Sequence, residues 1–286
     1  MARVAVRTAS SKRPASPAEF PFNADLQFVM FSRLLLAKLM TAIQPGTRSA
    51  ATSQPCLSVV VPVFNEATTV TSVIHAVLRQ PLVTEVLVVD DGSTDGTWEH
   101  LQGLVREGVP VRLFRHEVNC GKGAALRTGF SEATSPLVIV QDADLEYDPA
   151  EYPALAAPIL QGKADVVFGS RFQGAGAHRV LYYWHALGNK ALTAFSNMCT
   201  NINLTDMETG YKMFRREVLR NVRIEERRFG FEPEIVAKVV KLKGIRIYEV
   251  PISYSGRTYA EGKKIGMRDG LWAIWCIVKY NLWRRA

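Results

Sequence analysis

Short apolar, β-branched runs alternate with helical patterns from Leu57 onward. The runs predict strands at residues 57–64, 84–91, 111–117, 136–142 and 164–170, and the intervening segments repeat apolar residues at helical spacing. Strands with continuous apolar runs must be buried on both faces, which is typical of a parallel sheet covered by helices. The pattern therefore predicts an α/β fold of βαβ units, in which ligands bind beyond the carboxyl ends of the strands.

The pattern changes after about residue 172. A long helical segment covers residues 181–200, and it is followed by a strand-like run at 211–214, a helix near 231–242 and a strand at 245–254. We expect this part to complete the acceptor side of a cleft. From residue 267 the chain ends in an amphipathic helix that carries three of the five tryptophans, which is typical of a helix at a membrane interface.

Composition and charge narrow the function classes. The chain has 286 residues, of which 48% are apolar and 22% charged, as in an ordinary globular protein. The formal charge of +8 is concentrated at the ends, since residues 1–57 and 257–286 each carry seven Lys or Arg against two acidic residues. These basic residues flank apolar segments instead of following one recognition element, so we expect a membrane surface or a phosphate-bearing substrate, and no nucleic acid.

Cysteine usage and hydropathy bear on location. The four cysteines form no C-x-x-C pair and no metal-like spacing, which favours a reducing setting. No apolar stretch is long enough to span a bilayer, because Arg33 and Lys38 interrupt the N-terminal run. We therefore expect a cytoplasmic protein that is peripherally associated with a membrane. Residues 1–56 are predicted to be an N-terminal extension, partly disordered or amphipathic.

Three polar clusters follow predicted strands or begin helices. Residues 61–66 (VPVFNE) and 88–97 (VVDDGSTDGT), taken alone, favour turns that cap the next helix, and Pro62 is expected to end the ladder of the first strand. Residues 119–129 (NCGKGAALRTG) match neither a Walker loop nor a dinucleotide fingerprint. What remains in that cluster is Lys122, flanked by glycines at a helix N-terminus, a position that favours an anion.

A fourth cluster, VIVQDADLEYDP (138–149), places Asp142, Asp144, Glu146 and Asp148 at alternate positions. An extended segment would point the first three to one side, where carboxylates raise one another's pKa unless a cation neutralises them. Such oxygen ligands suit Mg²⁺ or Mn²⁺ together with a substrate diphosphate. A calcium loop is disfavoured because no glycine stands at its sixth position. Asp148 is instead assigned to the N-cap of the next helix.

An ordered set of motifs in this chain resembles the family 2 glycosyltransferases. The motifs are PVFNE, VVDDGSTDGT, NCGKGAALRTG, QDADLEYDP, GSR, DMETGYKMFRR and FGFEPEI. The likeness covers about residues 57–256 and is closest to the branch of dolichyl- and polyprenyl-phosphate sugar synthases. It implies a GT-A fold, with a Rossmann-like, mostly parallel sheet flanked by helices. It also implies a nucleotide-sugar donor, Mg²⁺ or Mn²⁺ as cofactor, and inversion at the anomeric carbon.

The resemblance also implies roles for particular residues. The nucleotide of a GDP- or UDP-sugar would be held by Pro62, Phe64, Asn65, Glu66, Asp91, Lys122 and Asp142. The metal would be held by Asp142, Asp144 and Glu146. Among these residues Asp144 is also named as catalytic, because it stabilises the departing diphosphate through the metal.

The acceptor decides whether the reaction needs a base. A lipid phosphate is already a nucleophilic anion at pH 7, whereas a sugar hydroxyl must lose a proton, for which Asp206 or Glu208 is the expected base. Candidates for binding an acceptor phosphate are Arg171, Arg179, Lys212, Arg257, Lys263 and Lys264. Arginine suits this role because it can bind phosphate bidentately. For Arg179 and Lys212 a solvated surface position is an equal alternative.

The predicted organisation has three parts. Residues 1–56 form the N-terminal extension, residues 57–256 the GT-A catalytic domain, and residues 257–286 an acceptor-side loop and a Trp-rich interfacial helix. The favoured hypothesis is an inverting, metal-dependent transferase that moves a sugar from a nucleotide donor to a polyprenyl phosphate at a membrane surface. A homo-oligomer or a membrane protein as a further partner is left open. Two alternatives stay open: transfer to a saccharide or other hydroxyl, and a non-catalytic nucleotide-binding scaffold.

Overall fold

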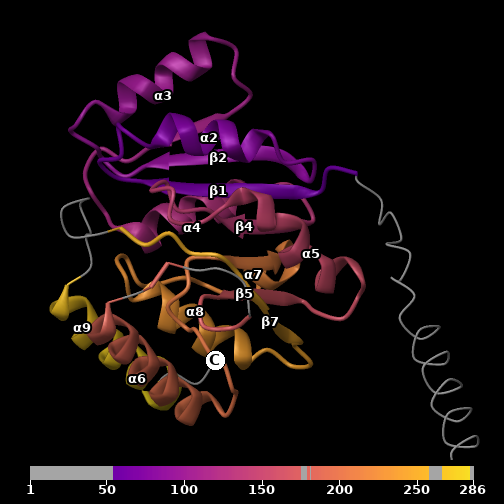
Figure 1. The fold of residues 1–286 in the computed structure, drawn as a ribbon, viewed down its shortest axis with the longest axis vertical. Helices are drawn as coiled ribbons and strands as arrows, with labels where there is room; N and C mark the ends of the chain where they lie inside the picture. Colours follow the sequence, from indigo (N-terminus) through magenta and orange to yellow (C-terminus); the bar gives the residue numbers. More distant parts are fainter. Residues whose placement is uncertain (1–53, 175–178, 181, 258–265, 284–286) are drawn as a thin grey trace, which may run out of the picture. The chain divides into compact units, whose positions relative to one another are not determined.

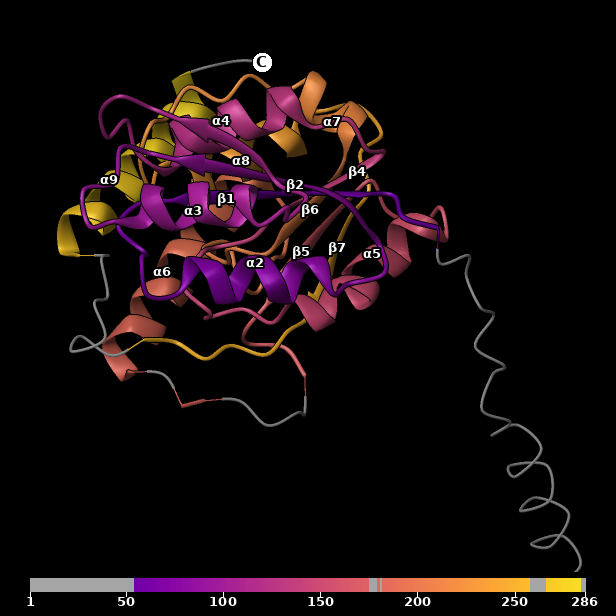
Figure 2. The ribbon, with the colours of Figure 1, turned by 90° about the horizontal axis from the view of Figure 1, so that it is seen from above.

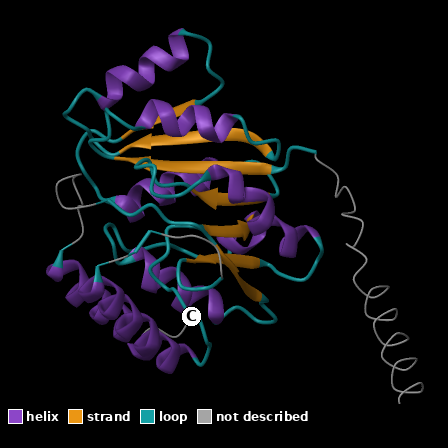
Figure 3. Ribbon diagram, viewed as in Figure 1, coloured by secondary structure: helices purple, strands orange, loops and turns teal. Residues whose placement is uncertain are grey.

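The computed structural model describes residues 54–174, 179–180, 182–257 and 266–283. Nearly all of the predicted N-terminal extension lies outside these residues, as do Lys263 and Lys264 of the predicted acceptor-side loop. The described part is built on a seven-stranded sheet with helices on both faces (Figure 1, Figure 3).

The sheet is mostly parallel. Its strands are β1 (Leu57–Val63), β2 (Val83–Asp90), β3 (Arg112–Arg115), β4 (Leu137–Val140), β5 (Val166–Ser170), β6 (Lys212–Arg215) and β7 (Ile247–Pro251). Their order is β3-β2-β1-β4-β6-β5-β7, and β6 runs antiparallel to both of its neighbours while every other pairing is parallel. This arrangement confirms the predicted α/β fold and gathers the carboxyl ends of β1, β2 and β4 at one edge.

Helices cover both faces of the sheet, as Figure 2 shows, and an apolar cluster of buried residues lies on each face. One face packs against α2 (Val70–Leu78), α3 (Thr97–Arg106) and α5 (Tyr152–Leu160), with the short η1 (Pro149–Glu151) before α5. The other face packs against α4 (Lys122–Glu132), α7 (Arg216–Arg220) and α8 (Phe231–Val240). Beside α8, α6 (Tyr183–Thr200) packs against α9 (Met267–Val278), which continues into the π-helical η3 (Lys279–Trp283). The predicted C-terminal helix is therefore present.

The ladder of the first strand continues past Pro62. β1 continues through Pro62 to Val63, so the expectation that Pro62 ends the ladder is wrong. The Val60 carbonyl accepts from the Gln141 amide at 2.9 Å, and that bond is the end of the pairing with β4. Alternate residues of a strand bond to alternate neighbours, so the missing N–H of Pro62 faces the side where β4 has already ended. The proline therefore removes no ladder hydrogen bond.

Asp148 begins the next helix, as predicted. Its carboxylate accepts from the Ala150 amide at 2.9 Å, and Pro149 occupies the first position of η1. Glu151, however, accepts from the Ser253 amide at 2.7 Å instead of closing a capping box. Glu151 thus links η1 to the chain after β7 by a hydrogen bond.

Candidate active site

Residues after β1 are fastened to the loop after β2. Asn65 adopts a left-handed backbone (φ 52°), its N–H donates to Ser93 Oγ at 2.9 Å, and its Oδ1 accepts from the Thr94 amide at 2.9 Å. The Glu66 amide donates to Thr97 Oγ1 at 2.9 Å. Asn65 therefore stabilises the turn after β1, and a turn is what the sequence of this cluster favoured. The nucleotide-binding role of Pro62, Phe64, Asn65 and Glu66 stays a prediction.

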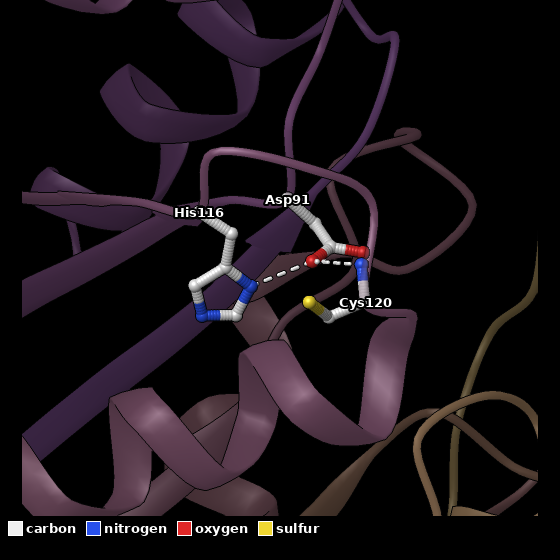
Figure 4. A group of neighbouring side chains, drawn as sticks. All are labelled: Asp91, His116 and Cys120. Carbon is white, nitrogen blue, oxygen red and sulfur yellow. Dashed lines mark hydrogen bonds and ion pairs between the residues drawn. The ribbon is translucent and has the colours of Figure 1, made fainter.

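Asp91 connects the end of β2 to the start of α4 (Figure 4). Its carboxylate lies 2.6 Å from His116 Nδ1 and accepts from the amides of Cys120 at 3.0 Å and Gly121 at 2.6 Å. Asp91, His116 and Cys120 lie close enough together to hold a metal ion. However, His116 Nε2 also lies 3.0 Å from Thr128 Oγ1, so both ring nitrogens already have partners. We interpret the trio as a hydrogen-bonded connection that fixes the N-terminus of α4.

Lys122, the first residue of α4, bridges two carboxylates. Its Nζ lies 2.9 Å from Asp142 Oδ1 and 3.1 Å from Glu232 Oε1, and all three side chains are at most 18% exposed. Burial lowers the pKa of Lys122, but Asp142 and Glu232 together raise it well above its ordinary value. The ammonium group is therefore charged at pH 7. A side chain on Gly123 would lie 2.3 Å from the Glu226 carbonyl, so the glycine lets α4 begin this close to the chain before α8.

The segment from Asp142 to Glu146 is a turn, so the predicted extended alternation is wrong. Leu145 adopts a left-handed backbone (φ 61°), and Asp144 Oδ1 accepts from the Glu146 amide at 3.2 Å. Burial raises the pKa of Asp144 to about 7, and the charges of Asp142 and Glu146 add to that increase. Asp142 and Glu146 are therefore close enough to Asp144 for their charges to act on it. A group of carboxylates that raise one another's pKa fits a divalent cation with oxygen ligands.

A polar and aromatic layer beneath Asp142 was not predicted. Gln141 is fully buried, its Nε2 donates to the Asp142 carbonyl at 3.0 Å, and its Oε1 accepts from the hydroxyls of Tyr152 at 2.6 Å and Tyr211 at 2.7 Å. Gly210 packs directly on the carboxylate, because a Cβ there would lie 2.3 Å from Asp142 Oδ2. The one signal in the sequence is a glutamine at the end of an otherwise apolar strand.

The chain after β7 packs against the segment from Asp142 to Glu146, which we call the acidic turn. Glu146 accepts from the Tyr254 hydroxyl at 2.7 Å and from the Arg257 amide at 2.6 Å. The Arg257 guanidinium pairs with both oxygens of Glu66, at 3.1 and 2.7 Å, and its Nε donates to the Asp144 carbonyl at 3.1 Å. Glu146 and Glu66, which were predicted to hold metal and nucleotide, therefore already have partners within the chain.

A cavity of about 310 Å³ lies at this junction. The residues that line it come from the start of α2, the acidic turn, the chain before α6 and the chain after β7: Thr68, Thr69, Asp144, Leu145, Arg179, Ser255 and Arg257. The structure thus brings the predicted metal ligand Asp144 together with Arg179 and Arg257, two of the predicted acceptor-phosphate ligands.

Arg171 and Asp206 form a bidentate pair. Arg171 Nε lies 2.7 Å from Asp206 Oδ2 and its Nη2 lies 2.8 Å from Oδ1. Asp206 is fully buried and also accepts from the Arg171 amide at 3.1 Å and from Asn189 Nδ2 at 3.2 Å. The guanidinium carbon lies 4.9 Å from the centre of the Tyr254 ring. The predicted base and the predicted phosphate ligand are therefore paired with each other.

Lys212 lies beneath the site. It is fully buried and donates to the carbonyls of Met207, at 3.0 Å, and of Thr209. Burial is the largest of the influences that lower the pKa of Lys212, which falls to about 8. A buried ammonium that is satisfied by backbone carbonyls does not reach a bound phosphate. Lys212 is therefore withdrawn from the acceptor ligands, and it holds the Asp206–Gly210 loop instead.

The fold and the site together define a GT-A glycosyltransferase. The family model described as glycosyl transferase family 2 matches residues 58–223, more than half of the chain, and the chain belongs to this family. Solved structures of glucosyl-3-phosphoglycerate synthase from Mycobacterium tuberculosis share the fold. The complex with Mn²⁺, UDP and phosphoglyceric acid has a TM-score of 0.63 and 22% identity, over 83% of this chain and 82% of that one. The complex with Mg²⁺ and UDP also has a TM-score of 0.63.

Several similar proteins are named as sugar transferases or synthases of lipid phosphates. The dolichol-phosphate mannosyltransferase of Pyrococcus furiosus is 30% identical over 214 residues, which are 73% of this chain and 59% of that protein. The undecaprenyl-phosphate mannosyltransferase of Micrococcus luteus is 28% identical over 72% of this chain and 86% of that protein. The dodecaprenyl-phosphate galacturonate synthase of Rhizobium johnstonii is 27% identical over 79% of this chain and 67% of that protein. Among the described helices of this chain, none is long and apolar enough to cross a bilayer.

Proposed function

We propose that this protein transfers a sugar, with inversion, from a GDP- or UDP-sugar to a polyprenyl phosphate at a membrane surface. The names of the relatives support a lipid-phosphate acceptor. In a single displacement, an acceptor phosphate oxygen forms a bond to the anomeric carbon while the bond to the donor diphosphate oxygen breaks. Attack from the face opposite the leaving group inverts the configuration.

The observation that carries the proposal is the pair of Arg171 and Asp206. Asp206 holds two nitrogens of the guanidinium, and Nη1 takes no part in that pair. Because Arg171 is only 11% exposed and its aspartate is fully buried, the pair fixes the direction of the remaining donor. A preorganised arginine suits an anionic oxygen of an acceptor phosphate. Arg179 lines the neighbouring cavity together with Arg257, whose guanidinium is paired with Glu66.

The same pair argues against a hydroxyl acceptor. A carboxylate that is occupied by a guanidinium, a backbone amide and Asn189 is poorly placed to remove a proton. Glu208, the second candidate base, has a pKa that burial and Glu232 raise to about 8. A carboxyl group with that pKa is mostly protonated at pH 7 and cannot act as a base in that form.

Asp142 and Asp144 would hold Mg²⁺ or Mn²⁺, and the raised pKa of Asp144 supports that role. When bound, the cation supplies positive charge to the diphosphate that departs. Lys122, which already contacts Asp142, would add a second positive charge at the same end of the donor. Glu146 accepts two hydrogen bonds from the chain after β7, so we expect it to orient the turn as well as to approach the metal.

Exposed aromatic residues support a membrane-surface location. On α9 and η3, Trp272, Trp275 and Trp283 are exposed together with Leu271. On α6, which packs against α9, Trp184 is 77% exposed. Tryptophans that gather on neighbouring helices are typical of a protein that lies at the headgroup level of a bilayer.

Product analysis tests the proposal. The protein is incubated with Mn²⁺, a short polyprenyl phosphate and each member of a panel of GDP- and UDP-sugars, and products are identified by mass. We expect one donor to give a glycosylated lipid phosphate. A product on a saccharide alone would favour the hydroxyl-acceptor alternative. No turnover of any donor, with intact nucleotide binding, would favour the non-catalytic scaffold.

The variant Asp206→Asn separates an anchor from a base. If Asp206 positions Arg171, the variant raises the KM for the lipid phosphate by about 10- to 100-fold, because an amide pairs less firmly with the guanidinium. A base would instead lose kcat with the KM unchanged. The affinity for the nucleoside diphosphate with Mn²⁺, measured by calorimetry, should match that of the unmodified protein and shows that the site is folded.

A further inference from the structure

The transferred sugar must lie between two groups of residues. Its anomeric carbon is bonded to the donor diphosphate, which the proposed function assigns to Asp142 and Lys122. The attacking phosphate is assigned to Arg171. The loop from Asp206 to Gly210 joins the two groups, since Asp206 holds Arg171 and Gly210 packs on the Asp142 carboxylate. The middle of this loop therefore lies between a residue that holds Arg171 and a residue that packs on Asp142.

Glu208 stands in the middle of that loop and has no hydrogen-bond partner among the residues that the structure describes. Its Oε1 is shut off from solvent, although the residue as a whole is partly exposed. Burial and Glu232 raise the pKa of Glu208, Lys212 and Arg171 lower it, and Asp206 raises it further. Glu208 is thus within electrostatic reach of both the donor and the acceptor groups. A buried polar atom without a partner costs free energy, so it needs an explanation.

Glu232 presents a second atom of the same kind. It is 4% exposed, its Oε1 pairs with Lys122 at 3.1 Å, and its Oε2 has no hydrogen-bond partner in the described part of the chain. Lys122 in turn contacts Asp142, so Glu232 belongs to the donor group. Glu208 and Glu232 are close enough for the charge of one to act on the other, and each keeps a buried oxygen without a partner among the described residues.

We propose that Glu208, assisted by Glu232, hydrogen-bonds to a hydroxyl group of the transferred sugar and so selects the donor. The proposal rests on the proposed function for the presence of a nucleotide-sugar donor, but not for the identity of the acceptor. A protonated Glu208 donates to a sugar oxygen and accepts from a hydroxyl, while the carboxylate of Glu232 only accepts. The hydroxyls replace the hydrogen bonds that the protein itself does not supply.

Direct binding tests the proposal without any acceptor. Calorimetry with Mn²⁺ measures the dissociation constants of UDP, UDP-glucose, GDP and GDP-mannose for the unmodified chain and for Glu208→Leu. We expect the variant to raise the dissociation constant of the preferred nucleotide sugar by about 10- to 100-fold, which corresponds to the loss of one or two buried hydrogen bonds. Binding of the matching nucleoside diphosphate should stay the same. Glu208→Gln, which keeps the size and both hydrogen-bonding functions, should retain most of the affinity.

Two outcomes would overturn the proposal. Equal affinities of Glu208→Leu and the unmodified chain for the nucleotide sugar would mean that water satisfies Oε1 and that the sugar does not. Equal weakening of sugar nucleotide and nucleoside diphosphate would mean a structural role. Glu107→Leu, at the exposed end of α3, is the matched control for loss of a glutamate. If both nucleotide sugars bind no better than their nucleoside diphosphates to the unmodified chain, the sugar contacts are refuted. If donor binding follows the expectation but no lipid product forms, only the proposed acceptor fails.

Discussion

Two carboxylates at opposite ends of the parallel strands have opposite environments. Glu85 lies near the start of β2, where burial raises its pKa but hydrogen bonds from Ser58, Thr134 and Arg112 lower it to about 2. Asp144 follows the end of β4, where burial together with Asp142 and Glu146 raises its pKa to about 7. One carboxylate is surrounded by donors, and the other by negative charge.

The difference separates a stabilising site from a functional one. Around Glu85 every partner belongs to the chain, so folding alone satisfies its charge. Asp144 accepts from the Glu146 amide, but burial and two neighbouring carboxylates disfavour its charge, which is a cost to the folded state in the absence of a ligand. A site that awaits a cation and a diphosphate has this property, because the ligand repays the cost on binding.

The largest expected effect follows from Asp144→Asn. Removing the charge should reduce sugar transfer by roughly 10³-fold, since the metal loses a ligand. The same change should raise the melting temperature of the metal-free protein at pH 8. The folded-state pKa of about 7 lies above the ordinary value of 3.8, so the folded state of the unmodified protein loses stability as pH rises between these values. The asparagine variant lacks this loss.

Melting curves at pH 5 and pH 8, with chelator and then with Mn²⁺, check this expectation. Mn²⁺ should raise the melting temperature of the unmodified protein more than that of the variant. A variant that melts below the unmodified protein at pH 8 without metal would show that Asp144 stabilises the fold. Asp144 and Glu85 would then both stabilise the fold, and the comparison between a functional and a stabilising carboxylate would fail.

Gly210→Ala is expected to cause a smaller loss of sugar-transfer activity. The added methyl carbon would lie 2.3 Å from Asp142 Oδ2 and 2.9 Å from the Tyr147 ring, so the Asp142 carboxylate must move. We expect transfer to fall by about 10- to 100-fold and Mn²⁺ to bind more weakly, because displacement of about 1 Å is costly at a reacting centre. Gly188→Ala in α6 is the control, since a methyl group there meets nothing within 4 Å. Equal activity of the two variants would mean that the exact position of Asp142 is unimportant.

The sequence predicted the fold because the fold depends on local patterns. Apolar runs placed the strands and helical spacing placed the helices, and both needed only neighbouring residues. The expectation that Pro62 ends the ladder was wrong, because the effect of a proline there depends on where β4 ends, which no local pattern records. The turn at Leu145 was also missed, since alternating carboxylates suggest an extended chain and a left-handed leucine has no sequence signal.

The sequence named many of the site residues but not their partners. Arg171 and Asp206 were assigned to competing mechanisms, although the fold pairs them across 35 positions. Lys212 was predicted to bind phosphate because its burial could not be foreseen. That burial follows from the packing of β6 against both neighbours. Gly210 had no apparent role until its distance to Asp142 was known. Residue type predicts the chemistry of a site, while pairing and burial depend on long-range contacts.

The smallest expected effects lie at the other end of the strands. Glu85→Gln removes the charge that accepts from Ser58 at 2.5 Å and from the Thr134 amide at 2.6 Å. We expect the free energy of unfolding at pH 7 to fall by about 1–3 kcal/mol, with kcat unchanged below the melting temperature. The folded-state pKa of about 2 lies below the ordinary 4.5, so the stability that the carboxylate contributes is present above pH 4.5 and is lost toward pH 2.

Urea unfolding at pH 7, 5 and 4 measures the free energy of unfolding of the unmodified protein and of Glu85→Gln. The difference between the two free energies should begin to shrink below pH 4.5. Arg112→Ala is the matched variant, because Arg112 also contacts Glu85, at 3.1 Å, but is 44% exposed. Solvent screens an exposed pair, so that variant should lose only about 0.2–1 kcal/mol. If Arg112→Ala costs as much as Glu85→Gln, the arginine provides the stabilisation. If it costs less, the buried hydroxyl and the backbone amide hold Glu85, which is the arrangement that Asp144 lacks.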